Sequence, residues 1–600
     1  MAMFDRKHFF LLLFITSNLF AQTPYPDYIG AGHYQGISVK TSSDLISQDW
    51  PVAATGYKTI DGKGLEGRAA EVCRFLDHAT FGASLQEIWS LQDKNFKTWI
   101  DEQIAVKRSD YTATTDSIYH YLYDYYLSQG KDSNELSGEP QWTEFRYAWW
   151  RIMQEGKDQL RLRMAYALSQ IFVISDNSEL GGSGFALSSY YDLLSQNAFG
   201  NFKDLLKSIA LHPSMGFYLS HLNNPKEVPE ENTHPDQNFA REIMQLFSIG
   251  LYQLNIDGTR KKDNLGKDIP TYTNSDIAEL AKVFTGLGIS ASVDTTYDLY
   301  FGRGIYGSDM TKPMKMYEEW HEPGPKRLPN GNIIPAGQAG MKDIDDAINF
   351  LYNHPNTGPF ICRQLIQRFT SSNPSKQYIT RVVQVFNNDG KGTRGNLAAV
   401  IKAILLDDEA RDCPSISDPY GGKLLEPMLR YTKFVRAIGI KPENEVAFNN
   451  GYRAQSRLFQ HPLSSPNVFN FYLPDYKPIG PLSNIGLVAP EFQIFNSLSA
   501  IDYPNIVHEW VYWDNVFDNW SGPDFNGYPQ LTKLLGAATN DETLINEIDL
   551  LFTHGEMSQE ARKLIMDSLK KTSHSAHGLV DRISLALYLA LISPDFVIKK

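Results

Sequence analysis

Cysteine is scarce in this sequence. The 600 residues include three cysteines, Cys73, Cys362 and Cys413, and none of them belongs to a CxxC or CxxCH pattern. At most one intrachain disulfide can form from three thiols, so one thiol is left over. The sequence therefore excludes a fold held by a disulfide framework, a cysteine zinc knot and a covalently attached c-type haem.

Positive charge is also in short supply. Lysine and arginine total 56 against 69 aspartate and glutamate, which gives a formal net charge of −13. A protein that wraps nucleic acid must neutralise many phosphates with basic side chains. The acidic balance therefore predicts no nucleic-acid partner, and it favours solubility without selecting any other partner.

Long hydrophobic runs are missing beyond the N-terminus. Arg6 and Lys7 precede an apolar stretch at residues 9–15, and Ala21 suits the last position before a cleavage site. This pattern is typical of a secretory signal peptide, and the apolar stretch is far shorter than the ~20 residues that a membrane-spanning helix needs. We expect a signal peptide at residues 1–21, a periplasmic or secreted protein, and no membrane span in the mature chain.

The common catalytic signatures are absent as well. The sequence has no GxSxG, no HExxH and no Walker-type lysine loop. A GxGxxG match at residues 302–307 leads into a turn, whereas a dinucleotide site needs a helix there. Residues 387–392 resemble a calcium loop but place Val385 where the first oxygen ligand belongs. These absences leave no cofactor and no metal assigned.

What the sequence does contain is helical periodicity over most of its length. It predicts a mainly α fold, a multi-helix globular core with a short β-like N-terminal arm and a loop-rich insertion. The expected parts are an extended arm at 22–68, a helical core at 69–520 with the insertion near 286–340, and a C-terminal helical segment at 521–600. Aromatic residues predict a strand or hairpin at 296–301. Predicted helices include 190–198, 202–210, 238–251, 360–369 and 424–438.

One predicted helix carries a polar edge beside its apolar stripe. Asp236 can cap it, and Asn238, Arg241 and Glu242 fall on neighbouring turns. These side chains could bind a polar substrate or position a metal in a cleft. The structural alternative, which we favour, is a capped helix whose buried Arg241–Glu242 pair holds helices together.

The loop-rich insertion supplies a second candidate. Three carboxylates, Glu318, Glu319 and Glu322, surround His321 within five residues. This group could ligate a divalent ion or supply an acid and a base, particularly with Glu242 opposite. A solvated charged loop explains the same composition equally well.

Taken in order, these motifs resemble the large bacterial domain-of-unknown-function family 1800, over about residues 69–495. The resemblance is carried by RFL and ATFG at 74–82, LRLRMA at 160–165, NFARE and LF at 238–247, YT and FTG at 272–286, RQLIQR at 363–368, and SPNVFNF with PDY at 465–476. It implies an exported, mainly helical protein, often encoded beside a second exported family that resembles alkaline-phosphatase-like enzymes. It implies no established reaction.

The sequence departs from the family at one helix. Many members have a His-x-His-Phe pattern after the arginine-rich helix, whereas residues 168–172 read LSQIF. This difference disfavours a histidine metal site at that position.

Two functions remain open. The favoured one is a non-catalytic binding or assembly role, with an exported protein encoded nearby as a partner and a polymer or small-molecule ligand left unidentified. The alternative is an exported hydrolase-like or metal-assisted enzyme acting on a polar extracellular substrate such as a carbohydrate polymer. In that enzyme, Glu242 is the acid or base, Arg241 binds the substrate and Asn238 orients it. His321 is then a second acid or base or a metal ligand.

Overall fold

The computed structural model describes residues 67–293, 298–411, 421–442, 457–512, 527–574 and 576–599. Within these residues helices dominate, and the named strands form only two-stranded antiparallel sheets. The predicted mainly α fold is therefore confirmed. The predicted signal peptide at 1–21, nearly all of the predicted arm at 22–68, and Cys413 lie outside the described residues.

The first described helices owe their starts to side-chain caps. The Ser84 hydroxyl accepts the Glu87 backbone N–H, while the Glu87 carboxylate accepts the Ser84 backbone N–H, which completes a capping box. Asn95 caps the next helix through Lys97. The helices are α2 (Arg68–Ala79), α3 (Leu85–Gln92) and α4 (Phe96–Ala105).

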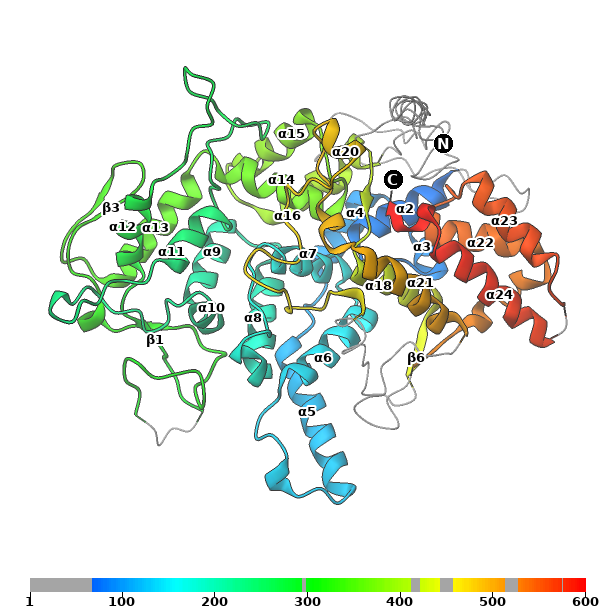
Figure 1. Ribbon diagram of the computed structural model, residues 1–600, viewed down its shortest axis with the longest axis horizontal. Helices are drawn as coiled ribbons and strands as arrows, with labels where there is room; N and C mark the ends of the chain where they lie inside the picture. The colour runs from blue at the N-terminus through cyan, green and yellow to red at the C-terminus, as the bar shows by residue number, and fades with distance from the viewer. Residues whose placement is uncertain are drawn as a thin grey trace, which may run out of the picture.

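The next helix, α5 (Tyr111–Ser128), projects from the body of the molecule (Figure 1). It packs on α6 and α8, and its far end exposes Tyr121 and Leu127. A one-turn 3-10 helix at Ser133–Glu135 follows it, and another at Glu179–Gly182 precedes α8. The helices of this region are α6 (Trp142–Glu155), α7 (Gln159–Ser169), α8 (Gly184–Asn197), α9 (Phe202–Leu211) and α10 (Pro213–Tyr218).

The central region carries the segments singled out by the sequence. Helices α11 (Asn238–Gln245) and α12 (Asn274–Val283) pack together, and a short 3-10 helix at Pro229–Glu231 precedes them. Between α12 and α13 (Gly340–Asn353) the described residues form two small two-stranded sheets and a 3-10 turn at Glu318–Trp320. Their strands are β1 (Leu287–Gly288), β2 (Lys315–Met316), β3 (Lys326–Arg327) and β4 (Ile333–Ile334).

Helices continue through the second half of the chain. They are α14 (Thr357–Phe369), α15 (Lys376–Asn387), α16 (Leu397–Leu406), α17 (Asp408–Arg411), α18 (Pro427–Ile438), α20 (Pro481–Asn484), α21 (Ser497–Tyr512), α22 (Asp541–Thr553), α23 (Gln559–Leu569), α24 (Ala576–Leu591) and α25 (Pro594–Val597). Short 3-10 helices lie at Pro490–Ile494, Leu531–Leu534 and Ala537–Thr539.

Two small sheets join distant parts of the chain. Strand β5 (Lys423–Leu424) pairs with β8 (Ile598–Lys599), and β6 (Ile440–Pro442) pairs with β7 (Gly527–Pro529). Helix α2 also packs on α22, so the first described helix lies among the last ones (Figure 1). Buried apolar side chains from Ala69 to Phe596 form one main hydrophobic cluster, and the fold closes around it.

Some predicted boundaries differ from the structure. Residues 298–301 of the predicted strand form no strand, and residues 296–297 lie outside the described part. Leu424 belongs to β5, because its neighbour Leu425 donates its backbone N–H to Val597 near the C-terminus. No helix among the described residues has both the length and the apolar character needed to cross a membrane.

Candidate functional site

Helix α11 ends six residues earlier than its predicted last residue, Leu251. The backbone N–H groups of Leu246 and Phe247 both donate to the Glu242 carbonyl, which breaks the regular ladder after Gln245. Gly250 then adopts a φ of 69°, and a Cβ there would lie 2.7 Å from the Phe360 ring. Close packing against α14 therefore turns the chain where the apolar pattern alone predicts more helix.

Glu242 lies buried on α11, and its side chain is 5% exposed. Its Oε2 atom has no hydrogen-bond partner among the described residues. Burial raises the pKa of Glu242 to about 7, although the charge of Arg241 opposes the shift. A carboxyl with this pKa exchanges its proton near neutral pH.

Arg241 and Asn238 do not share that burial. Arg241 is exposed and Asn238 is half-buried, and the structure shows no ion pair between Arg241 and Glu242 in its described part. The Asp236 carboxylate accepts the Asn238 backbone N–H at 2.8 Å, next to the start of α11. The buried Arg–Glu pair of the structural alternative is therefore absent, because the guanidinium lies on the solvent side of the helix.

His321 is buried, and its hydrogen-bond network in the described part of the chain does not include Glu242. Its Nδ1 lies 2.9 Å from the Thr285 carbonyl oxygen, and its Nε2 lies 3.0 Å from the Asp343 carboxylate. The Lys326 ammonium also donates to Asp343. Both ring nitrogens are engaged, and no hydrogen bond or ion pair joins His321 to Glu242 among the described residues.

The carboxylates near His321 serve neighbouring backbone groups. Glu318 accepts the Gly340 backbone N–H at the start of α13, and Glu322 accepts the Gly324 backbone N–H. His321 belongs to no group of three metal-ligating side chains in the part of the chain that the structure describes. The local turn thus accounts for Glu318 and Glu322.

A cavity of about 350 Å³ lies at the C-terminal end of α11. This volume is within the range of small-molecule pockets. We call it the Arg363 pocket. Its walls come from the end of α11 and the loop after it, from α14 and from the segment before α20. They are formed by Gln170, Ile171, Gln245, Leu246, Gly250, Leu251, Tyr252, Leu254, Arg260, Pro359, Phe360, Arg363, Gln364, Gln367, Arg368, Val468, Phe469, Tyr472, Leu473, Pro474 and Asp475.

Several polar side chains of this pocket have no partner in the described part of the chain, and the buried Gln364 amide nitrogen is one example. Arg363, Gln245 and Asp475 make no side-chain hydrogen bond or ion pair among the described residues, although each lines the cavity. Burial lowers the pKa of the Arg363 guanidinium, and the nearby charge of Asp475 opposes that shift. Arginine stays protonated under these conditions, so the pocket presents a cation, an anion and an amide.

Other polar side chains of the lining are engaged by neighbouring groups. The Tyr472 hydroxyl donates to the Glu426 carboxylate at 2.9 Å, and the Gln170 amide donates to it at 2.7 Å. The Arg368 guanidinium lies 4.5 Å from the centre of the Tyr472 ring. Glu426 stays ionised because Lys423 and nearby arginines outweigh the effect of burial and lower its pKa.

Apolar groups near solvent complete the pocket. Phe469 is 42% exposed and Leu251 is 48% exposed, and both line the cavity. The Phe469 ring has no aromatic partner among the described residues, and its backbone N–H is fixed by the Asn467 side chain at 2.9 Å. An exposed aromatic ring at a polar cavity is a common feature of ligand sites.

A larger and more open hollow of about 900 Å³ lies beside α5, α8 and α9. Several of its polar side chains already have partners, although Gln196 and Ser208 in the same lining have none among the described residues. Asp192 accepts from Arg108 and from the backbone of Tyr111 and Thr112, and His212 accepts the Ser214 backbone N–H. These groups stabilise the helix starts and leave little for a ligand.

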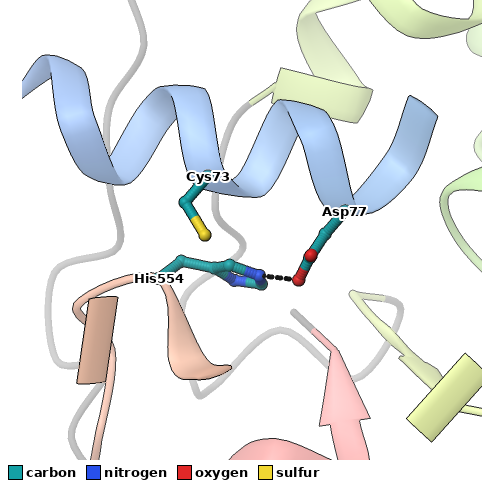
Figure 2. Close-up of side chains that lie close together, drawn as sticks. All are labelled: Cys73, Asp77 and His554. Atoms are coloured by element: carbon teal, nitrogen blue, oxygen red, sulfur yellow. Dashed lines mark hydrogen bonds and ion pairs between the residues drawn. The ribbon is translucent and has the colours of Figure 1, made fainter. Parts of the chain in front are cut away.

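A second buried cluster joins the two ends of the fold. Figure 2 shows Cys73 and Asp77 on α2, with His554 facing them from the end of α22. One possible ligand atom from each lies within 4.8 Å of the others, and all three side chains are buried. A thiol, a carboxylate and an imidazole in this arrangement suit a transition metal in principle.

The charges in this cluster disfavour a bound metal ion. The Lys433 ammonium donates to Asp77 and to the Phe552 carbonyl, and it lies 3.2 Å from His554 Nε2. Burial raises the pKa of Asp77, but Lys433 and His554 outweigh it and bring the pKa down to about 2. Burial holds the pKa of the Cys73 thiol high, and the thiol donates to the Leu550 carbonyl at 3.0 Å. The chain thus places its own cation beside the carboxylate.

The helices and the Arg363 pocket define a mainly α-helical protein with a ligand-sized polar cavity. The chain matches the family described as "Protein of unknown function (DUF1800)" over residues 74–598, and it belongs to that family. The match confirms the resemblance seen in the sequence and continues beyond residue 495 to β8. A comparison with curated proteins and one with solved structures each give no match.

Sequence reasoning did not identify the Arg363 pocket. The sequence predicts no site role for Gln245, Arg363, Phe469 or Asp475. Arg363, Phe469 and Asp475 do occur in the segments RQLIQR, SPNVFNF and PDY that carry the family resemblance. Their presence in segments that carry the family resemblance is the one sequence signal that could have marked them as candidate site residues.

Proposed function

We propose that this chain is an exported protein of the cell envelope or the surrounding medium that binds a small polar ligand in the Arg363 pocket. One observation carries the proposal: Arg363, Gln245 and Asp475 line a cavity of about 350 Å³ without hydrogen-bond partners of their own. Arg363 and Gln245 are half-buried and Asp475 is exposed, so these groups face the cavity and its solvent. A ligand that pairs with them exchanges their bonds to water for direct hydrogen bonds, which are stronger where the ligand and the apolar walls exclude water.

The pocket lining supports binding without catalysis. Among the described residues, the lining contains no histidine, serine, threonine, cysteine or lysine, and Asp475 is its one carboxylate. Acid–base catalysis by carboxyl groups usually uses two groups with different pKa values, and covalent catalysis needs a nucleophile with a base beside it. The lining offers hydrogen-bonding groups and apolar surface instead, which suits recognition.

Export is the second part of the proposal, and it rests on the sequence. Residues 1–21 have the basic, apolar and cleavage-site regions of a signal peptide. Expression of the full chain in a bacterial host, followed by cell fractionation and mass measurement, tests this part. We expect a periplasmic or extracellular product shortened by about 20 residues. An uncut product confined to the cytoplasm overturns it.

A second candidate function is supported by Glu242. Its pKa of about 7 and its unpaired Oε2 are properties of a general acid or base. In that function the chain is an enzyme on a polar extracellular substrate, with the reacting group bound one helical turn from Gln245. A substrate turnover that is lost in Glu242→Gln while ligand binding persists supports this candidate over simple binding.

Saturation-transfer NMR tests binding in the Arg363 pocket. The probes are methyl β-D-glucoside, methyl α-D-mannoside, D-glucuronate, L-serine and benzoate, each mixed with the purified full-length protein. We expect transfer to at least one probe, loss of that transfer in Arg363→Ala, and retention in Arg241→Ala. Arg241 is a matched control because it is an exposed arginine on the helix that borders the pocket. Transfer to none of the probes, or transfer unchanged in Arg363→Ala, overturns the proposal.

A further inference from the structure

We infer that the ligand of the Arg363 pocket is a neutral saccharide unit, bound through adjacent hydroxyl groups to Arg363, Asp475 and Gln245 and by one ring face to Phe469. The inference rests on the proposed function and adds the chemical class of the ligand. It is carried by the charge balance of the pocket, by its mixture of donors and acceptors, and by the free aromatic ring at its edge.

The charge balance favours a neutral ligand. Arg363 and Asp475 are the unpaired charged groups of the lining, and they have opposite signs. The Arg260 guanidinium is paired with Asp268 at 2.9 Å. The positive charge of Arg368 is balanced by the nearby negative charges of Glu426 and Glu491. An anionic ligand that approaches Arg363 is therefore opposed by Asp475, and a cationic ligand is opposed by Arg363.

The hydrogen-bonding groups match hydroxyls. Arg363 can only donate, ionised Asp475 can only accept, and the Gln245 amide does both. A hydroxyl group donates one hydrogen bond and accepts others, so neighbouring hydroxyls can satisfy all three side chains at once. A ligand carboxylate can use only the donors, and it brings a second negative charge towards Asp475.

The aromatic group fits the same ligand. Phe469 is 42% exposed, lines the pocket and has no ring contact with another described residue. A sugar ring has apolar C–H groups on its face, and these pack on an aromatic ring whose face carries partial negative charge. Leu251, which is 48% exposed, adds apolar surface to the same cavity. A ligand with hydroxyls on its edge and C–H groups on its face meets both kinds of surface.

Titration calorimetry on the full-length protein tests the class of ligand. The neutral probes are the methyl glycosides of glucose, galactose, mannose and xylose, and the charged or zwitterionic probes are D-glucuronate, benzoate and L-serine. We expect at least one glycoside to bind, with glucuronate and benzoate about tenfold weaker or more, a difference of about 1.4 kcal/mol. We expect Asp475→Asn and Phe469→Leu each to weaken glycoside binding by about fivefold to tenfold.

Controls separate these effects from damage to the fold. Tyr121→Leu removes an exposed aromatic ring from the far end of α5, away from the pocket lining, and should leave binding unchanged. Circular dichroism should give the same melting temperature, within about 2 °C, for Phe469→Leu and Tyr121→Leu, because both side chains are partly exposed.

The outcomes distinguish the two proposals. Binding of glucuronate, benzoate or serine through Arg363 with no glycoside bound overturns the saccharide inference and leaves ligand binding intact. Glycoside binding that is indifferent to Asp475→Asn and Phe469→Leu also overturns the inference. No binding by any probe overturns both the inference and the proposed function.

Discussion

Asp77 and His554 are joined by a hydrogen bond although 477 residues separate them in the sequence. Asp77 lies near the end of α2, and His554 adopts a left-handed conformation just after α22. Lys433 reaches the same carboxylate from α18. Three distant segments therefore meet at one buried carboxylate, and its removal affects all of them.

Replacing Asp77 by asparagine should strongly destabilise the fold. The change leaves the Lys433 ammonium buried without its carboxylate, and breaking a buried ion pair from one side costs about 3–5 kcal/mol. Urea denaturation followed by circular dichroism measures the difference. Asp116→Asn is the control, because Asp116 forms an exposed pair with His120 and should change stability by less than about 1 kcal/mol. Equal effects of the two substitutions would contradict the role of Asp77.

Metal chelation should leave the cluster around Cys73 intact. Lys433 places a positive charge beside Asp77, and the raised pKa of the Cys73 thiol keeps it protonated, whereas metal ligation requires a thiolate. Treatment with EDTA should shift the melting temperature by less than about 1 °C. Zinc present at one equivalent after purification, and lost in Cys73→Ser, would instead establish a metal site.

Glu242→Gln should stabilise the protein at alkaline pH. The folded pKa of Glu242, about 7, lies above the usual value of 4.5, so folding favours the protonated form. The stabilisation from this proton is complete below pH 4.5 and is lost as the pH rises through 7. Glutamine is uncharged at every pH, so the variant does not lose this stabilisation. We expect equal stability of the two proteins near pH 4.5 and an advantage of about 1–2 kcal/mol for the variant at pH 8, less than the full shift gives because residual solvent screens the carboxylate.

Denaturation at several pH values between 4.5 and 8 provides the measurement for Glu242. Arg241→Gln, which changes an exposed side chain next to it, serves as the comparison. A variant that is less stable than the original at pH 8 would show that the Glu242 carboxylate has a stabilising partner.

His321→Ala should reduce stability without changing ligand binding. The substitution removes contacts to Thr285 and Asp343 and leaves a cavity in a buried site, at a cost of about 2–4 kcal/mol. His120→Ala, at an exposed position on α5, should cost less than about 0.5 kcal/mol. Loss of glycoside binding in His321→Ala at unchanged stability would restore the catalytic or metal-binding role predicted for His321.

Local signals in the sequence predicted much of the fold. The helix predicted at 202–210 matches α9 closely, because Asn201 caps its first turn and an apolar stripe runs along it. The family resemblance was likewise visible in short motifs. The end of α11 was missed because it depends on Gly250 and Phe360, which approach each other only in the folded protein.

Local sequence patterns could not predict the Arg363 pocket, for a related reason. Gln245, Arg363 and Asp475 are each more than a hundred residues from the next, and each looks like an ordinary surface residue in its own segment. We propose them as a site because they line one cavity and form no side-chain hydrogen bond with any described residue, a property that no periodic pattern encodes. The same holds for Glu242, whose raised pKa reflects burial and not its neighbours in the sequence.

The pairing of β5 with β8 sets the order in which this protein can mature. Lys599 donates to the carbonyls of Phe369 and Asp77, so the core around α2 needs a residue that lies 522 positions after Asp77 in the chain. At about 5–20 residues per second, synthesis of the intervening chain takes roughly 25–100 seconds. During that interval α2 can pack on α3, α7 and α16, but it lacks its contacts with α22 and with Lys599. The region around Asp77 is therefore expected to close late, after the helices that precede α22 have already packed on one another.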